Sequence, residues 1–170
     1  MTDFPDVLEY LIRRDLTYND ILRFKITTDI ERVYVPVFWE DELVNYVGQD
    51  LTGTSERKYL YCRGAKTTPY LFGWEESKEW DRVALVENTF VAIAFRDRVR
   101  TTTNFGSFLS ETQVQLLSTG RRRSVAILWD EGAERNAERC VKKLRKSGTP
   151  AAYAVMQGQP DDHPVEMIET

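Results

Sequence analysis

The chain has 170 residues, of which 42% are apolar and 12% aromatic, enough for one domain or a compact pair of subdomains with a real core. Its 23 basic and 27 acidic residues give a formal net charge of −4, which argues against attraction of the whole surface to nucleic acid or anionic lipid. Cys62, Cys140 and the one histidine, His163, cannot supply a four-ligand zinc site or a disulfide framework. No apolar run approaches the roughly 20 residues that span a bilayer, and the acidic start is unlike a signal peptide. We therefore expect a cytoplasmic protein with no zinc and no membrane partner.

The first third of the chain predicts a helical hairpin followed by strands. Apolar residues at helical spacing indicate a helix near residues 7–12, and a second helix begins after Thr17, a typical N-cap with Asp20 three residues on. Alternating β-branched and aromatic residues then predict a small, mostly antiparallel sheet with strands at residues 33–38, 43–47 and 58–61. Pro36 cannot donate to a ladder, so we expect an edge position or a bulge there. Residues 48–56 are expected to form a polar loop.

The second half alternates short apolar runs with helical stretches. Strands are predicted at residues 83–86, 99–103, 125–129 and 151–155, and helices at residues 90–95, 110–118 and from 130 to 146. This alternation with short connections implies parallel strands and right-handed crossovers. We therefore predict an α/β protein with a small N-terminal α+β subdomain over residues 1–78. An open, mainly parallel, Rossmann-like sheet with flanking helices is expected over residues 79–158, followed by a flexible tail over residues 159–170.

Two acidic residues follow strands of the predicted parallel sheet. Glu87 comes directly after residues 83–86, and Asp130 directly after residues 125–129. Functional groups of open parallel sheets collect at the carboxyl ends of the strands. Acids at strand ends are also common exposed turn formers, so both a chemical and a turn-forming role remain open on spacing alone.

The sequence around these acids resembles the TOPRIM domain of bacterial and phage DNA primases. The similar segments are Leu-Val-Glu-Asn-Thr-Phe at 85–90, a Gly-Ser turn at 106–107, and Ile-Leu-Trp-Asp-Glu-Gly-Ala at 127–133. The front half, with Lys-Tyr-Leu at 58–60, resembles the part of the primase core that precedes TOPRIM. The resemblance covers roughly residues 6–162. It implies a TOPRIM sheet, a role in DNA replication, a core without the usual zinc-binding and helicase parts, and the host cytoplasm if the chain is phage-encoded.

The resemblance also implies roles for individual residues. TOPRIM enzymes use a glutamate after the first strand as general acid or base, and an Asp-x-Asp pair after a later strand to hold Mg²⁺. Glu87 matches the glutamate and Asp130 the second aspartate, whereas Leu128 stands in place of the first and is interpreted as a core residue. Glu131 is a candidate substitute ligand. We therefore expect weak binding of Mg²⁺ or Mn²⁺ at Asp130 and Glu131, and little or no catalysis.

Two groups of basic residues are candidate contacts to single-stranded DNA. Residues 120–150 hold nine basic and four acidic side chains, a local balance of +5; the predicted contacts among them are Arg121, Arg122, Arg123, Lys142, Lys143, Arg145 and Lys146. In the second group, Lys58, Arg63 and Lys66 are interleaved with tyrosines, which suits stacking on unpaired bases. The resemblance also places Lys58 near nucleotide and template. Both groups have an alternative interpretation as ordinary solvated surface.

Three functions follow as hypotheses. The first is a primase-type TOPRIM core that binds single-stranded DNA or a replisome partner such as a helicase, with catalysis reduced or absent. The second is an active, divergent, Mg-dependent primase or nucleotidyltransferase that uses Glu87 and Asp130. The third is a non-catalytic scaffold that assembles other proteins.

Overall fold

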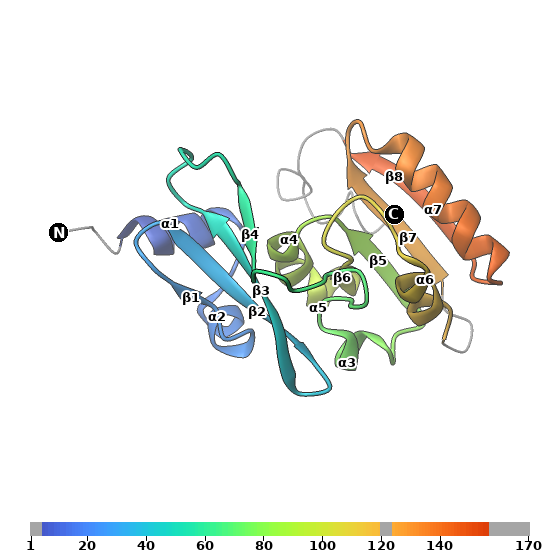
Figure 1. Ribbon diagram of the computed structural model, residues 1–170, viewed down its shortest axis with the longest axis horizontal. Helices are drawn as coiled ribbons and strands as arrows, with labels where there is room; N and C mark the ends of the chain where they lie inside the picture. Colours follow the sequence, from blue (N-terminus) through green and yellow to red (C-terminus); the bar gives the residue numbers. More distant parts are fainter. Residues whose placement is uncertain (1–4, 120–123, 157–170) are drawn as a thin grey trace. The chain divides into compact units, whose positions relative to one another are not determined.

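The computed structural model describes residues 5–119 and 124–156, and the chain divides into two compact units between Lys66 and Thr67 (Figure 1). The sequence predicted a boundary after residue 78, twelve residues later in the chain than this division. Residues beyond 66 belong to the second unit because their backbone is hydrogen-bonded within it. Phe72 N–H donates to the Thr103 carbonyl at 3.0 Å, and Gln113 Nε2 donates to the Tyr70 carbonyl at 2.7 Å. The predicted tail at 159–170 lies outside the described residues.

The first unit combines two helices with a four-stranded antiparallel sheet. The helices are α1 (Pro5–Arg13) and α2 (Tyr18–Arg23). The sheet has the order β1-β2-β3-β4, with β1 (Thr27–Thr28), β2 (Arg32–Trp39), β3 (Glu42–Asp50) and β4 (Tyr59–Tyr61). The N-cap of α2 is as predicted, because Thr17 Oγ1 accepts from Asp20 N–H at 3.2 Å while the Asp20 carboxylate accepts from Thr17 N–H at 2.8 Å.

The pairing of β2 explains how a proline fits in this sheet. Strand β1 pairs only with Val33 and Tyr34, so Pro36 lies beyond the segment that has neighbours on both sides. A register irregularity follows directly, between Val37 and Phe38. Both observations agree with the expected edge position or bulge.

Strand β3 continues further than the sequence predicts. Gly48, assigned to a polar loop, pairs with Tyr34 on β2 and Leu60 on β4, and the strand ends only at Asp50. Only glycine leaves room here for the Tyr34 ring, because a Cβ added at Gly48 would lie 2.8 Å from Cε1 of Tyr34. A glycine that signals a turn in the sequence therefore serves here to let an aromatic ring cross the strand.

The second unit is built on a four-stranded parallel sheet with the order β6-β5-β7-β8. The strands are β5 (Arg82–Val86), β6 (Thr101–Thr103), β7 (Ser124–Asp130) and β8 (Ala151–Met156). The helices are α3 (Trp74–Ser77), α4 (Thr89–Ala94), α5 (Arg96–Val99), α6 (Glu111–Ser118) and α7 (Glu134–Lys146). The predicted mixed α/β class, with one antiparallel and one parallel sheet, is confirmed.

Helix α7 is the element that the sequence predicts best. It contacts β7 and β8 (Figure 1) and buries Ala137, Cys140, Val141 and Leu144, which belong to the predicted apolar face. Gly148 follows the helix with φ +85°, a conformation that glycine adopts without strain. The buried side chains of β7 that lie on one face of the strand are Val125, Ile127 and Trp129.

Strand β6 is shorter than predicted. Val99 ends α5, Arg100 has φ +56°, and the strand begins only at Thr101. Its three threonines are buried although they are polar, because each hydroxyl donates to a carbonyl within 2.9 Å: those of Ala92, Phe72 and Glu87.

A buried arginine holds the segment that leads into β5. Arg96 is 1% exposed, and its guanidinium donates to the Gly73 carbonyl at 2.7 Å, the Thr101 carbonyl at 3.0 Å and the Glu76 carboxylate at 3.0 Å. It also lies 4.6 Å from the Trp80 ring. Gly73 has φ +58° and passes so close that an added Cβ would lie 2.5 Å from Nη2 of Arg96. No helix in the described part of the chain is long and apolar enough to cross a membrane.

Candidate functional site

The two predicted acids meet at the carboxyl edge of the parallel sheet. Glu87 follows β5 directly, and Asp130 is the last residue of the neighbouring strand β7. Both side chains are half-buried. Burial, together with the Asp130 charge, raises the pKa of Glu87 above its usual value, although a hydrogen bond from the Asp130 backbone partly opposes the shift. The charge of Asp130 therefore acts on the Glu87 carboxyl group.

The backbone around Glu87 is fixed by its neighbours. Thr103 Oγ1 donates to the Glu87 carbonyl at 2.9 Å. The next residue, Asn88, is buried and caps α4, its Oδ1 accepting from Phe90 N–H at 2.8 Å. These contacts hold Glu87 between the end of a strand and the start of a helix.

Leu128 lies on the same face of β7 as Asp130, because side chains two residues apart in a strand share a face. It is half-buried, whereas Ile127 and Trp129 on the other face are fully buried. The interpretation of Leu128 as a core residue is therefore wrong; the strand pattern puts it on the less covered face, paired with Val86 and Ala154. A leucine in this place offers no oxygen ligand beside Asp130.

The geometry allows at most a small carboxylate site. Glu131 follows the end of β7 in an exposed turn. Over residues 5–119 and 124–156, no group of three or more His, Cys, Asp and Glu side chains is placed to hold a metal ion. Two carboxylates alone leave most of the coordination sphere of a Mg²⁺ ion to water. The raised pKa of Glu87 moves it towards the range in which a carboxyl group acts as a general acid or base.

Most of the described basic residues of α7 that were predicted to contact DNA have partners within the protein. Lys142 pairs with Glu138 at 2.7 Å, and Arg145 Nε donates to the Ala151 carbonyl at 2.8 Å. Lys143 has three contacts: the Glu111 carboxylate at 2.9 Å, the Leu109 carbonyl at 3.2 Å and the Phe108 ring at 4.8 Å. Lys146 is exposed. Arg121, Arg122 and Arg123 lie outside the described residues.

The three predicted DNA contacts of the first unit flank strand β4. Lys58 precedes the strand and Arg63 and Lys66 follow it, all three exposed. Lys58 Nζ lies 5.5 Å from the centre of the Tyr59 ring. The predicted neighbour Tyr61 is 39% exposed, which leaves its ring accessible beside these charges.

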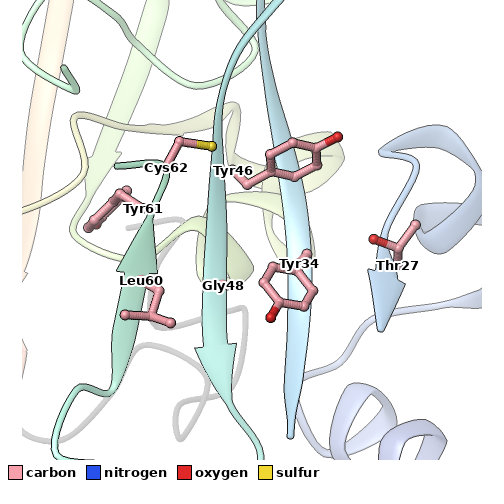
Figure 2. Close-up of a pocket in the computed structure, with 7 residues that line it drawn as sticks. All are labelled: Thr27, Tyr34, Tyr46, Gly48, Leu60, Tyr61 and Cys62. Atoms are coloured by element: carbon pink, nitrogen blue, oxygen red, sulfur yellow. The ribbon is translucent and has the colours of Figure 1, made fainter. Parts of the chain in front are cut away.

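Tyr61 lines a hollow on the antiparallel sheet that was not predicted from the sequence. Its volume is about 430 Å³, and strands β1 to β4 together supply most of its lining (Figure 2): Thr27, Tyr34, Tyr46, Gly48, Leu60, Tyr61 and Cys62. The sequence signal was Tyr46 and Gly48, two residues apart on β3, together with Tyr34 on β2. Strand register decides which of these residues become neighbours. The register pairs Tyr34 with Gly48.

Comparison with known proteins supports the architecture at the level of the fold. No protein-family model matches the sequence, and no curated protein matches it. A crystal structure of the Aquifex aeolicus primase, comprising its zinc-binding and RNA polymerase domains, matches with a TM-score of 0.79 and 16% sequence identity. The match covers 95% of this chain and 54% of the primase chain, so the protein spans about half the length of that neighbour. The chain therefore has a primase-like fold.

Proposed function

We propose that the protein is a primase-like protein of DNA replication whose parallel sheet is a TOPRIM domain, and that it binds single-stranded DNA or a replisome partner with catalysis reduced or absent. One observation carries this proposal. In a fold like that of a bacterial primase, the sheet edge has Glu87 and Asp130 together, while the position that shares a face with Asp130 is Leu128.

The chemical reason is the charge of the reacting phosphates. Phosphoryl transfer needs divalent cations to neutralise and orient phosphate oxygens. Glu87 and Asp130 would hold such an ion, with Glu131 as a further carboxylate only if the exposed turn moves. Two carboxylates leave most of the coordination sphere to water and substrate, so the affinity for Mg²⁺ or Mn²⁺ is low.

An active, divergent primase or nucleotidyltransferase is the second candidate. The raised pKa of Glu87 favours it, because a carboxyl group that titrates closer to neutral pH is suited to general acid or base catalysis. Its expected signature is a loss of product formation in Glu87→Gln, with unchanged binding of single-stranded DNA.

Metal affinity tests the role assigned to Leu128. Titration calorimetry with Mn²⁺ on the wild-type protein should show weak binding, and Leu128→Asp should bind at least tenfold more tightly because it adds a carboxylate on the face of Asp130. Leu128→Asn is the matched control, since it removes the apolar side chain without adding charge. Equal affinity in wild type and Leu128→Asp, with both proteins folded by circular dichroism, would contradict the proposed metal position.

DNA binding tests the other half of the proposal. Fluorescence anisotropy with a labelled single-stranded oligonucleotide should show binding that weakens as salt rises, because basic side chains displace counterions from the phosphates. Charge reversal of Lys58, Arg63 and Lys66 should weaken binding more than reversal of Lys142 and Lys143, whose charges already face Glu138 and Glu111. Absence of binding at low salt would favour a partner-binding or scaffold role instead.

A further inference from the structure

The hollow on the antiparallel sheet of the first unit has the composition of a site for a flat, uncharged ring. Two tyrosines, Tyr34 and Tyr46, lie on the face of the sheet that holds Gly48 and Leu60, whereas the ring of Tyr61 points away from them (Figure 2). No residue of the lining is charged. Tyr46 is 36% exposed, so its ring is accessible to a ligand. A volume of about 430 Å³ lies within the range of sites that bind small ligands.

The position of the Tyr34 ring is set before any ligand arrives. Its hydroxyl donates to Asp29 Oδ2 at 2.7 Å, and Gly48 leaves the space that the ring occupies over β3. Asp29 also accepts from the backbone N–H groups of Glu31 and Arg32 at 2.8 and 2.7 Å. These donors hold the pKa of Asp29 below its usual value, so the carboxylate stays ionised and anchors the tyrosine. A ring fixed in this way loses little freedom when a ligand stacks on it.

The charges on the β4 side of the hollow are mostly positive, whereas the Asp29 carboxylate lies at the Tyr34 hydroxyl. Residues 56–66, which include β4, contain four basic residues and one acidic residue, Glu56, a balance of +3; the basic residues are Arg57, Lys58, Arg63 and Lys66. All four basic side chains are exposed. An uncharged aromatic hollow beside exposed cations complements a ligand that alternates flat bases with phosphates.

We propose that this hollow stacks an unpaired base of single-stranded DNA, while Lys58 and Arg63 lie against the neighbouring phosphates. The inference rests on the proposed function, because it takes single-stranded DNA as the ligand. It adds the place at which a base is held, which is the aromatic face of the first unit and not the acidic edge of the second. Stacking on tyrosine uses the face of the base, so the site accepts all four bases with modest preference.

The first test separates bases from phosphates. An anisotropy titration compares a labelled oligothymidylate with an abasic strand that has the same length and charge. Wild type should bind the strand with bases at least fivefold more tightly, the effect of about 1 kcal/mol of stacking. Tyr46→Ala should lose most of that difference, Tyr46→Phe should retain it, and Tyr18→Ala is the control because Tyr18 is 70% exposed in the same unit and lies outside the hollow.

The second test uses a thiol that lines the hollow. Cys62 is exposed and Cys140 is buried, and the chain has two cysteines in all, so a thiol reagent reports on Cys62 in the folded protein. Oligothymidylate should slow the labelling of Cys62 severalfold, whereas the abasic strand at equal occupancy should not. Gly48→Ala, which pushes the Tyr34 ring from its place, should remove the protection.

The outcomes distinguish the two proposals. If wild type binds neither strand at low salt, single-stranded DNA is not a ligand and both the DNA-binding function and this inference fail. If wild type binds both strands equally well and Cys62 is labelled at the same rate, DNA binding stands but the base is not held in the hollow. Protection by free thymidine monophosphate as strong as by the oligonucleotide, at equal base concentration, would also overturn the inference by making the hollow a mononucleotide site.

Discussion

The two sheets of this protein expose their polar and aromatic groups in different ways. In the parallel sheet, residues 83–86 of β5 and all of β6 are buried, so these two strands offer accessible side chains only beyond their ends, as at Glu87. In the antiparallel sheet, β2 and β3 alternate between buried valines and side chains such as Tyr34 and Tyr46 that line an open hollow. A strand covered on both faces offers a site only at its edge, whereas a strand covered on one face offers the other face as a surface.

The largest effect is expected from the buried polar interior of the second unit. Arg96→Ala should lower the free energy of unfolding by about 3 to 5 kcal/mol, because it removes a buried charge with three hydrogen bonds and leaves the Gly73 and Thr101 carbonyls without their donor. Urea unfolding followed by tryptophan fluorescence measures the change. Lys142→Ala, which breaks an exposed pair with Glu138, is the control and should cost less than about 1 kcal/mol. Similar losses in the two variants would show that the Arg96 contacts do not stabilise the unit.

The second largest loss of stability is expected where Gly73 approaches Arg96. Gly73→Ala should destabilise by about 2 kcal/mol or more, since it adds both a side chain at positive φ and a contact with the buried guanidinium. Gly148→Ala is a matched control in the same unit, because Gly148 has φ +85° and open space around its missing Cβ; it should cost about 1 kcal/mol. The difference between the two midpoints of urea unfolding isolates the steric contact, and equal midpoints would contradict it.

The cap at the site edge gives a smaller effect. Asn88→Ala should cost about 1 kcal/mol, because the buried Phe90 N–H loses its acceptor at the start of α4. Asn88→Asp keeps an acceptor oxygen and should retain more of the cap. Thermal unfolding by circular dichroism ranks the variants, and a stability of Asn88→Ala equal to that of wild type would mean that the cap contributes nothing.

The smallest effect depends on pH and tests whether the two acids interact. The pKa of Glu87 is raised above its usual value of 4.5 by burial and by Asp130, so folding favours the protonated form. Below pH 4.5 the side chain is neutral in both the folded and the unfolded protein, so it does not lower the free energy of unfolding. As the pH rises through the pKa of the folded state, ionisation of the side chain lowers the free energy of unfolding. Glu87→Gln should therefore unfold at higher urea than wild type at pH 7 and at the same urea below pH 4.5. A difference that does not change with pH would contradict the shift, and in an Asp130→Asn background the difference should shrink.

Local patterns predict much of this fold, and long-range pairing explains the rest. The apolar face of α7 and the cap at Thr17 depend only on residues that are close in the sequence, and the structure confirms both. Gly48 and Arg96 could not be assigned in the same way, because the reason for each is a partner 14 and 23 residues away in the chain, Tyr34 and Gly73. Residues 99 and 100 were predicted as strand from composition, but Arg100 ends a helix with positive φ.

The same distinction holds for the candidate site. Glu87 and Asp130 were predicted because strand ends of a parallel sheet meet at one edge, a rule that needs no register. The exposure of Leu128 and the neighbours of Tyr61 in the hollow depend on register and on what covers each face, which the sequence does not specify.

Primer synthesis is the measurement that tests the central claim most directly. The wild-type protein is incubated with a single-stranded DNA template, ribonucleotides and Mg²⁺ or Mn²⁺, under salt conditions in which anisotropy shows that the template is bound. We expect bound template and little or no primer, because Leu128 offers no carboxylate on the face of Asp130. Robust primer synthesis that is abolished by Glu87→Ala or Asp130→Ala would contradict the account and establish an active enzyme.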